Sequence, residues 1–460
     1  MARPQALSPT PTTIVFVQAA QIQASPTSLK FPEGSRIVRL DLNSRSDRQP
    51  LELTQGLYAA AGPRISFDAS RVMFSAKKSP SAPWQIWEMN LDGGQKQQVT
   101  SCDADCMSAA YLPDGEIVYT AKNAGSDTSA FLAVAKLDGS EARRITFGPG
   151  DWRVETVLRD GRIVASASWP LDKDQGAARN RLLYTLRPDG TGLNALRCEH
   201  SGVAVRGEVA ELEDGSIAYV KSASGSPVDG TLTEVRKGQV HERAVAVGTE
   251  RLGFPEEIAD GQLMVSRMQK SAADGAGKLD LYAFDLRKGA ITRKIYGDPR
   301  QNSFQAVPVL AHAVPKKFWS LVIAESHSGY FIALDSYSSS GDMTRSTATE
   351  IHSVRVWTLP AGRTQEESLG EAPVEKDGSF YVEVAADQPV RFELLDANGN
   401  VLRSEHGYIW SRPGEQRGCA GCHSDQAIAP ENRWPMTLKR FDTPTRLTQS
   451  QNAARDAHGN

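Results

Sequence analysis

The chain has 460 residues, too many for one ordinary hydrophobic core, so we expect two or three domains. Its 52 Lys and Arg residues nearly balance 55 Asp and Glu residues, which leaves a formal net charge of -3 with no block of like charge. This balance argues against nucleic acid or an anionic membrane as the main partner, and no apolar run approaches the ~20 residues that span a bilayer.

Short alternating strands separated by Asp-Gly turns fill most of the chain. Residues 1–11 predict a disordered tail, and the strands begin at Thr12. Asp-Gly favours a tight turn because Gly accepts positive φ and Asp caps its own turn. A β-rich run follows each of the pairs Asp114-Gly115, Asp160-Gly161, Asp214-Gly215 and Asp260-Gly261. Their spacing of about 45–50 residues, with four short strands per unit, is typical of a propeller blade.

Counting these units predicts an all-β fold with a six-bladed β-propeller over residues 12–315. Ile14 to Val17 align with the second strand of a unit, so the innermost strand of that blade should come from after the sixth unit. Val307 to Leu310 is the candidate for this ring-closing strand. An open β-solenoid or a sandwich is the alternative architecture.

The units resemble the TolB-like (WD40-like) propeller family. The resemblance lies in Ser66-Phe67-Asp68, Met73-Phe74-Ser75 and Gln85-Ile86-Trp87. It implies the fold and says little about function, because propellers carry many activities. The sequence contains no Gly-x-Ser-x-Gly elbow of the kind that a serine hydrolase domain would bring.

Three cysteines lie within the propeller region. Cys102 and Cys106 could form a small disulfide, as an oxidising compartment allows, or could remain two unpaired thiols, since spacing alone does not fix the geometry. Cys198 is left over and is expected to be buried or inert.

Residues 316–409 predict a small β-rich domain after the propeller. The expected strands are Tyr330–Asp335, Val354–Trp357, Ser379–Val384 and Val390–Leu395. Asn398-Gly399 is a hairpin signal that follows the last of them. Residues 410–445 are predicted to be irregular, and residues 446–460 to be a disordered tail.

The strongest signal in the chain is Gly418-Cys419-Ala420-Gly421-Cys422-His423. Two cysteines three apart with a histidine after the second form the pattern for covalent attachment of c-type haem, in which each thiol adds to one vinyl group. The imidazole of His423 then becomes an axial ligand of the iron. Segment 410–445 is therefore predicted to bind one covalent haem c.

Two other interpretations of the Cys-x-x-Cys pair are a structural zinc site and a redox disulfide. A zinc site would need four ligands, and the chain has no second Cys-x-x-Cys pair. A thioredoxin-like redox pair would sit in a βαβ context, which the neighbouring sequence does not show.

Haem attachment to this motif predicts a periplasmic or extracellular protein with a secretory signal. Ile14 to Val17 are too short for the apolar core of such a signal, and only Arg3 supplies a positive charge before them. We expect the signal peptide to have been removed from this chain and Met1 to have been added.

A longer stretch around the motif resembles a known family. Gly370 to Phe380, Gln388-Pro389-Val390, Leu395 to Gly399 and Trp410 to His423 are similar, in order and spacing, to the middle domain of the hydrazine synthase alpha subunit and its relatives. The match spans about residues 300–440. It implies a six-bladed propeller joined to a haem-bearing segment, in periplasmic redox proteins with c-type haem.

The chain departs from that family in its iron ligands. In the family, a tyrosine shortly after the motif binds iron and the histidine of the motif goes to zinc. Here Ala427 stands four residues after His423, and the family's second haem-attachment motif is absent from the sequence. We carry over the fold, the haem and the compartment, but not hydrazine synthesis.

The sixth position on the iron separates electron transfer from chemistry on a small ligand. His327 ranks first as the second iron ligand, and the further candidates are His352, His406 and Met436. Each of them could equally be an ordinary surface or core residue.

Arginines and tryptophans flank the motif. Arg417 and Arg433 are candidates for pairing with haem propionates, because a planar guanidinium matches a carboxylate, and Arg412 lies nearby. Solvated charge is the alternative for each. Trp410 and Trp434 could cover the faces of the macrocycle or could belong to the core of the β-rich domain.

The sequence favours a periplasmic haem c redox protein, for electron transfer or as a small-molecule haem oxidoreductase, with the propeller as scaffold. Its expected partners are a redox partner protein and a small molecule at the haem. One alternative is a propeller-based binding module whose haem is structural or sensing. Another is a structural protein stabilised by zinc or a disulfide, without haem. The sequence names no catalytic residue and does not establish an enzyme.

Overall fold

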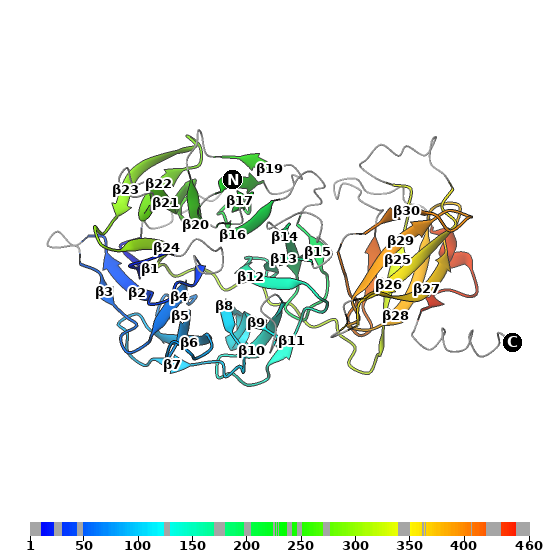
Figure 1. Cartoon of the computed structure of the whole chain (residues 1–460), viewed down its shortest axis with the longest axis horizontal. Coiled ribbons are helices and arrows are strands. Elements are labelled where there is room, and N and C mark those ends of the chain that lie inside the picture. The colour runs from blue at the N-terminus through cyan, green and yellow to red at the C-terminus, as the bar shows by residue number, and fades with distance from the viewer. Residues whose placement is uncertain are drawn as a thin grey trace, which may run out of the picture.

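The computed structural model of the chain describes residues 11–22, 30–43, 49–123, 129–169, 180–196, 204–223, 226, 228, 230–236, 242–245, 251–269, 277–338, 350–360, 363, 365–405, 407–419 and 434–447. These residues form two bodies built from β-sheets, a ring of blades and a sandwich, which lie side by side (Figure 1). The predicted all-β propeller fold is confirmed.

Each blade of the ring is an antiparallel sheet of four strands. Over the described ranges there are six such blades, made of β24 with β1–β3, β4–β7, β8–β11, β12–β15, β16–β19 and β20–β23. The third and fourth blades also share one parallel pair between Ala130 and Asp151. The first strand of each blade lies innermost, next to the axis of the ring.

The strands of the ring, in chain order, are β1 (Thr13–Ala19), β2 (Arg36–Asp41), β3 (Leu51–Glu52), β4 (Ala59–Ile65), β5 (Arg71–Lys77), β6 (Gln85–Asn90), β7 (Gln97–Gln98), β8 (Cys106–Leu112), β9 (Glu116–Lys122), β10 (Ala130–Lys136), β11 (Arg143–Arg144), β12 (Asp151–Val157), β13 (Ile163–Ser168), β14 (Leu182–Leu186), β15 (Asn194–Ala195), β16 (Val205–Glu211), β17 (Ile217–Ser222), β18 (Thr231–Val235), β19 (Glu242–Ala244), β20 (Leu252–Ala259), β21 (Gln262–Gln269), β22 (Lys278–Asp285), β23 (Ala290–Tyr296) and β24 (Asn302–Pro308). A short 3-10 helix, η1 (Pro113–Gly115), joins β8 to β9.

The ring closes through β24, which pairs antiparallel with β1. The strand runs from Asn302 to Pro308, so it overlaps the predicted segment Val307 to Leu310 only at Val307 and Pro308. The first half of the strand was not predicted because it carries polar residues and lacks an apolar alternation. These polar residues have structural partners. Asn302 Oδ1 accepts the backbone N–H of Leu279 at 3.0 Å, and Gln305 Oε1 accepts that of Gly62 at 2.9 Å.

The predicted Asp-Gly turns place Gly where no other residue fits. Gly161 has φ +90°, and a Cβ there would lie 1.9 Å from the carbonyl oxygen of Lys316. Gly190 has φ +84°, and its Cβ would lie 2.4 Å from the carbonyl oxygen of Ile145. Both glycines therefore shape the turns and let neighbouring chain segments pass close to the blade.

The second body is a β-sandwich with an apolar core between two four-stranded sheets. One sheet has the order β31-β25-β28-β32, and the other has the order β27-β26-β29-β30. The strands are β25 (Ser328–Ala333), β26 (Ser353–Thr358), β27 (Glu367–Pro373), β28 (Phe380–Ala385), β29 (Val390–Leu395), β30 (Val401–Ser404), β31 (Gln416–Cys419) and β32 (Thr445–Arg446), with a 3-10 helix, η3 (Met436–Lys439), against β28. Phe331, Phe380 and Phe392 meet in the core, with ring centroids 5.2 and 5.8 Å apart.

The segment predicted to be irregular, residues 410–445, contributes more to the sandwich than expected. β31 lies beside β25 in parallel, and β32 lies beside β28 in parallel. Both strands are short and pair only with strands distant in sequence, so local patterning gave no sign of them.

Residues 309–327, which we call the strap, cross one face of the ring from β24 to β25 (Figure 1). The strap is held by hydrogen bonds to the second and fourth blades. The N–H of His312 donates to Phe67 O at 2.9 Å, and the N–H of Lys316 donates to Arg159 O at 3.0 Å. The N–H of Leu321 donates to Asp189 Oδ2 at 2.8 Å.

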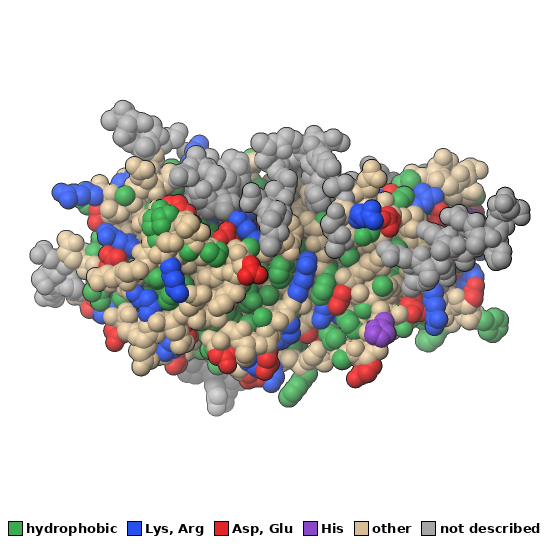
Figure 2. Space-filling model, turned by 60° about the horizontal axis from the view of Figure 1, so that its bottom comes forward, with side chains coloured by type: hydrophobic (Ala, Val, Ile, Leu, Met, Phe, Trp, Pro, Cys, Tyr) green, Lys and Arg blue, Asp and Glu red, His purple; other side chains and the backbone are tan. Residues whose placement is uncertain are grey.

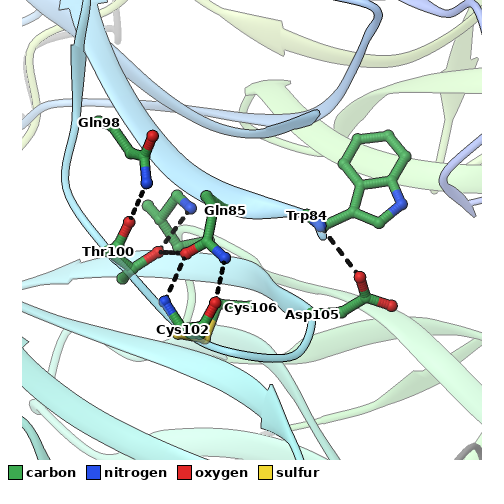
Figure 3. Close-up of a disulfide and its surroundings, with 8 residues drawn as sticks. Trp84, Gln85, Gln98, Thr100, Cys102, Asp105 and Cys106 are labelled. Atoms are coloured by element: carbon green, nitrogen blue, oxygen red, sulfur yellow. Dashed lines mark hydrogen bonds between the residues drawn. A yellow bond between two sulfur atoms is a disulfide. The ribbon is translucent and has the colours of Figure 1, made fainter. Parts of the chain in front are cut away.

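Cys102 and Cys106 are joined in a disulfide at the start of the third blade, which confirms one of the two predicted alternatives (Figure 3). The side-chain amide of Gln85 makes two hydrogen bonds to this loop. Its Oε1 accepts the N–H of Cys102, and its Nε2 donates to the carbonyl of Cys102, both at 2.9 Å. Cys198 lies outside the described residues.

No helix within the described ranges is long and apolar enough to cross a membrane. On the face shown in Figure 2, basic and acidic side chains are interspersed over the described surface. This mixed pattern matches the nearly balanced charge of the sequence.

Candidate haem site

Gly418 and Cys419 are the part of the predicted haem motif that the structure describes, and Cys419 carries the first thiol. It ends β31, the edge strand of its sheet, where it pairs with Ala333 and accepts the N–H of Leu334 at 2.9 Å. Its side chain is half-buried against the sandwich core and carries a free thiol. Burial raises the pKa of this thiol to about 11, so the thiol is neutral at physiological pH.

The rest of the predicted motif and several candidate ligands lie outside the described residues, namely Cys422, His423, Arg433, His406 and Ala427. The described flanks of the motif include one open strand face and two exposed apolar side chains. A side chain added at Gly418 would meet nothing within 4 Å, so the face of β31 that carries Gly418 is open, whereas Cys419 lies on the other face, against the core. The side chains of Trp434 and Met436, which follow the motif, are 69% and 36% exposed, and both are apolar groups that a porphyrin could cover.

Glu405 and Arg417 share the neighbourhood of Cys419. Arg417 lies two residues before Cys419 on β31, so both side chains leave the same face of the strand. Burial raises the pKa of Glu405 to about 7. Two groups oppose this increase and lower the pKa: the N–H of Phe392, which donates to Glu405 Oε2 at 3.3 Å, and the positive charge of Arg417. The carboxyl of Glu405 in turn disfavours ionisation of the Cys419 thiol.

Arg417 connects the sandwich to the ring. Its guanidinium donates to the carbonyl of Trp410 at 2.6 Å and to the carbonyl of Leu193 at the edge of the fourth blade. It also lies over the ring of Phe331, with 5.6 Å between the guanidinium carbon and the ring centroid. These contacts use part of the five donors of an arginine, so pairing of Arg417 with a propionate stays a prediction.

Trp410 anchors this end of the chain on the fourth blade. Its side chain is fully buried, its Nε1 donates to Gly190 O at 3.2 Å, and its ring meets that of Trp152 at 5.3 Å between centroids. Arg412 pairs with Asp387 at 2.8 Å within the sandwich, rather than standing as solvated charge. Of the two tryptophans considered as haem covers, Trp410 is therefore a core residue of the contact between the two bodies.

Glu415 strengthens the same contact. One carboxylate oxygen accepts the N–H of Gly192 from the ring at 2.7 Å, and the other accepts the N–H of Arg412 at 2.8 Å. The strand that carries Cys419 thus begins directly after a segment bonded to the ring. A group attached at Cys419 would be held in a constant position relative to the fourth blade.

The structure does not bring His327 to Cys419. His327 precedes β25, whereas Cys419 pairs with Ala333 at the other end of that strand. Six residues of strand separate the two positions, about 20 Å along the sheet. His327 is exposed, and its role as an iron ligand stays a prediction.

Met436 and His352 lie at the Cys419 end of the sandwich. The N–H of Met436 donates to Asp377 Oδ2 at 2.7 Å, in the turn that precedes β28. β28 lies two strands from β31, about 10 Å across the sheet. His352 is exposed at the start of β26, in the opposite sheet, and its carbonyl accepts the N–H of Val374 at 3.1 Å.

A buried ion cluster that the sequence did not reveal lies among the inner strands of the ring. Lys30 Nζ is 3.1 Å from Glu208 Oε1 and 3.8 Å from Glu155 Oε2, and Arg64 donates to the carbonyl of Glu155 at 3.0 Å. The residues come from separate blades, so local sequence carries no signal of their meeting. Within the part of the chain that the structure describes, no group of three or more His, Cys, Asp and Glu residues is arranged to hold a metal ion.

Comparison with known proteins identifies the same relatives in sequence and in structure. Residues 335–424 match the family model of the hydrazine synthase alpha subunit middle domain. The chain is 22% identical to hydrazine synthase subunit alpha of Kuenenia stuttgartiensis, with 90% of this chain and 67% of that protein covered. The structure of Kuenenia stuttgartiensis hydrazine synthase superposes with a TM-score of 0.81 and 19% identity over 94% of this chain and 72% of that one.

TolB from Acinetobacter baumannii superposes less closely, with a TM-score of 0.44 and 16% identity over 66% of this chain and 67% of that one. The likeness to the hydrazine synthase structure extends over both bodies and their connection. The chain is thus similar to hydrazine synthase in its fold and, over residues 335–424, to the middle domain of the alpha subunit in its sequence.

Proposed function

We propose that this hydrazine synthase alpha-like chain is a periplasmic c-type haem protein that transfers electrons or acts on a small ligand, with the ring as its scaffold. The observation that carries the proposal is the placement of Cys419. A free thiol ends an edge strand, half-buried against the sandwich core, directly after a segment bonded to the fourth blade.

Cys419 and Cys422 would hold the haem through thioether bonds, and His423 would bind the iron. Bound haem would supply a one-electron redox centre whose potential depends on its second axial ligand and on its burial. The exposed apolar side chains of Trp434 and Met436 would be covered by the macrocycle, which removes apolar surface from water.

Among the described candidates for the second axial ligand, Met436 ranks first in this proposal. It belongs to the same side of the sandwich as Cys419 and follows the motif in the chain, whereas His352 sits on the opposite sheet. Methionine opposite histidine is the ligation of electron-transfer cytochromes c and raises the reduction potential.

The electrostatic surroundings suit a redox centre whose potential depends on pH. Glu405, with its pKa raised to about 7, lies near Cys419 and would add a negative charge beside the haem edge in alkaline solution. A negative charge near the iron favours the ferric state, so the potential should fall as pH rises through 7.

The test is a pyridine haemochrome spectrum and an intact mass of the full chain, exported to the periplasm of a host with c-type maturation. The expected result is one covalent haem per chain in the wild type and none in Cys419→Ala/Cys422→Ala. Cys198→Ala is the matched control, because it removes a cysteine outside the motif and should retain the haem. Colourless wild-type protein with the mass of the bare polypeptide would overturn the proposal.

Addition of CO to the ferrous protein separates the two roles. A six-coordinate iron that resists CO indicates electron transfer, whereas rapid CO binding indicates a site for a small ligand. Hydrazine synthesis is the activity named for the relative. We do not propose it for this chain, because Ala427 stands where the resembling family has a tyrosine that binds iron.

A further inference from the structure

Lys30 reaches across the centre of the ring from the first blade. The innermost strands surround this centre and contact one another in the order β24, β4, β8, β12, β16 and β20, which returns to β24 (Figure 1). The first blade therefore adjoins only the second and the sixth. Lys30 lies between β1 and β2 of the first blade, yet its ammonium contacts Glu155 on β12 and Glu208 on β16. Because the fourth and fifth blades are not neighbours of the first, this ammonium lies at the axis of the ring.

The two carboxylates that receive this ammonium are positioned by other groups. Glu155 Oε1 accepts the hydroxyl of Ser166 at 2.6 Å, and Glu155 Oε2 accepts the backbone N–H of Glu208 at 2.8 Å. Glu208 has φ +55° and lies in a bulge of β16, where the pairing with β17 shifts register. A bulge redirects the backbone and the side chains of its strand. The position of Glu155 and the backbone of Glu208 are therefore set by the ring itself, without the lysine.

Without Lys30, the surrounding charges would not balance. Arg64 on β4 donates to the carbonyl of Glu155 at 3.0 Å, and Glu256 on β20 has no hydrogen-bond or ion-pair partner among the residues that the structure describes. Burial raises the pKa of both Glu208 and Glu256, and the positive charge of Arg64 acts against this increase in each. Three carboxylates would thus share one guanidinium. Uncompensated charge is unfavourable at positions as buried as Glu155 and Glu208, which are 4% and 13% exposed. The cluster therefore requires a positive charge at the position of the ammonium.

The distances fit an ammonium group better than a metal ion. Lys30 Nζ lies 3.1 Å from Glu208 Oε1, a hydrogen-bond distance, and 3.8 Å from Glu155 Oε2. A magnesium or calcium ion would need carboxylate oxygens at about 2.0 to 2.6 Å, together with several further oxygen ligands. An ammonium group instead offers three N–H donors, which can point to separate acceptors. The pair of glutamates is thus suited to a primary ammonium, the group that occupies it here.

The backbone beside Lys30 is held by contacts that do not involve its ammonium. Gln305 Nε2 donates to the carbonyl of Lys30 at 2.8 Å. The next residue, Phe31, is buried and meets the ring of Trp84, with 5.4 Å between centroids. We therefore expect the segment to keep its place when the ammonium is removed, which leaves the two glutamates open to a free ligand.

We propose that Glu155 and Glu208 form a binding site for a primary alkylammonium ligand at the axis of the ring, and that Lys30 fills this site from within the chain. An ammonium on the same chain has an effective concentration in the millimolar range, so a free ligand binds only by competing with it. Lys30 therefore acts as an internal competitor that excludes weak ligands. The site lies in the ring, apart from Cys419, and does not depend on the function proposed above.

Thermal melts of the full chain with methylammonium chloride test the proposal. In Lys30→Ala, methylammonium should raise the melting temperature with a saturable dependence on concentration, because the ligand restores the missing charge. The wild type, whose site is filled, should need at least about 10-fold more methylammonium for the same effect. Tetramethylammonium chloride has the same charge but no N–H donor, so it controls for ionic strength and should not stabilise the variant. If Lys30→Ala is only partly folded, methylammonium but not tetramethylammonium should restore its far-ultraviolet circular dichroism.

Replacement of one glutamate tests which residues form the site. Lys30→Ala/Glu208→Gln keeps the shape of the side chain but removes its charge. It should weaken methylammonium binding by about 10-fold or more, because a hydrogen bond to a charged group is lost. Lys30→Ala/Glu257→Gln is the matched control. Glu257 also lies on an innermost strand, β20, but it pairs with Arg159 at 3.7 Å, outside the cluster, so its replacement should leave the binding unchanged.

Three results would overturn the proposal. They are a Lys30→Ala variant that gains neither stability nor folded structure from methylammonium, an equal response to tetramethylammonium, and an affinity that Glu208→Gln leaves unchanged. A wild-type chain that responds at the same concentration as Lys30→Ala would place the ligand elsewhere and would equally refute the proposal.

Discussion

Glu405 offers a pH-dependent test of how the surroundings of Cys419 are built. Replacement of Glu405 by Gln removes the ionisable proton but keeps an oxygen that can accept the N–H of Phe392, which lies 3.3 Å from the carboxyl in the structure. The glutamate pKa is 4.5 in its ordinary state and about 7 in the folded protein, where burial is the main cause of the increase.

The sign and the size follow from proton linkage. Because the folded state holds the proton more tightly than the unfolded state, Glu405 costs no stability below its ordinary pKa. Stability then falls as pH rises from about 4.5 to about 7, and stays constant above that range. At about 1.4 kcal/mol per pKa unit, the loss at pH 8 is at most about 3 kcal/mol, and less if water reaches the carboxylate.

Chemical denaturation of wild type and Glu405→Gln across this pH range measures the difference. The two proteins should be equally stable near pH 4, and the variant should become more stable by up to about 3 kcal/mol at pH 8. Glu366→Gln is the control of opposite sign. Although burial disfavours its charge, hydrogen bonds from Arg391 and Tyr408 lower the pKa of Glu366, so its loss should destabilise the protein above pH 4.5. A pH-independent difference at Glu405 would refute the reasoning.

Three further predictions concern the contact between the two bodies, the disulfide and the iron. Trp410→Ala should cost about 3–5 kcal/mol in unfolding free energy and make the sandwich melt before the ring, whereas Trp410→Phe should cost less; a single unchanged melting transition would contradict this. Cys102→Ser/Cys106→Ser should lower the free energy of unfolding by about 2 kcal/mol in a denaturant titration, and no change would mean that the disulfide adds nothing to the loop. Met436→Ala should lower the haem reduction potential in a spectroscopic redox titration and change the ferric spectrum, while His327→Ala should alter neither; the opposite pattern would place the iron at the other end of β25.

Local sequence determined the repeats, because turn conformation depends on only a few adjacent residues. Asp-Gly pairs such as Asp160-Gly161 and Asp214-Gly215 occupy the turns that they predicted, and both glycines have positive φ. The strand Val390–Leu395 and the hairpin at Asn398-Gly399 were also predictable, since apolar runs and a tight turn lie next to each other in the chain.

The ring-closing strand shows where local patterning failed. Asn302 and Gln305 make the first half of β24 polar, so the apolar pattern indicated only its last residues. Their side chains bond to Leu279 and Gly62 in other blades. A buried polar side chain stabilises the fold only when hydrogen-bond partners are in place, and the sequence does not show which distant residues supply them.

The predicted haem motif rests on spacing alone, because two thiols and an imidazole would have to reach one porphyrin from one short segment. The side chains that surround Cys419 depend instead on the pairing of distant strands. Only the pairing of β31 with β25 places Cys419 near Glu405 and leaves His327 at the far end of the strand. Short-range chemistry therefore determined the turns, the repeats and the candidate attachment motif of this protein, whereas the register between distant strands determined which charges and candidate ligands stand beside it.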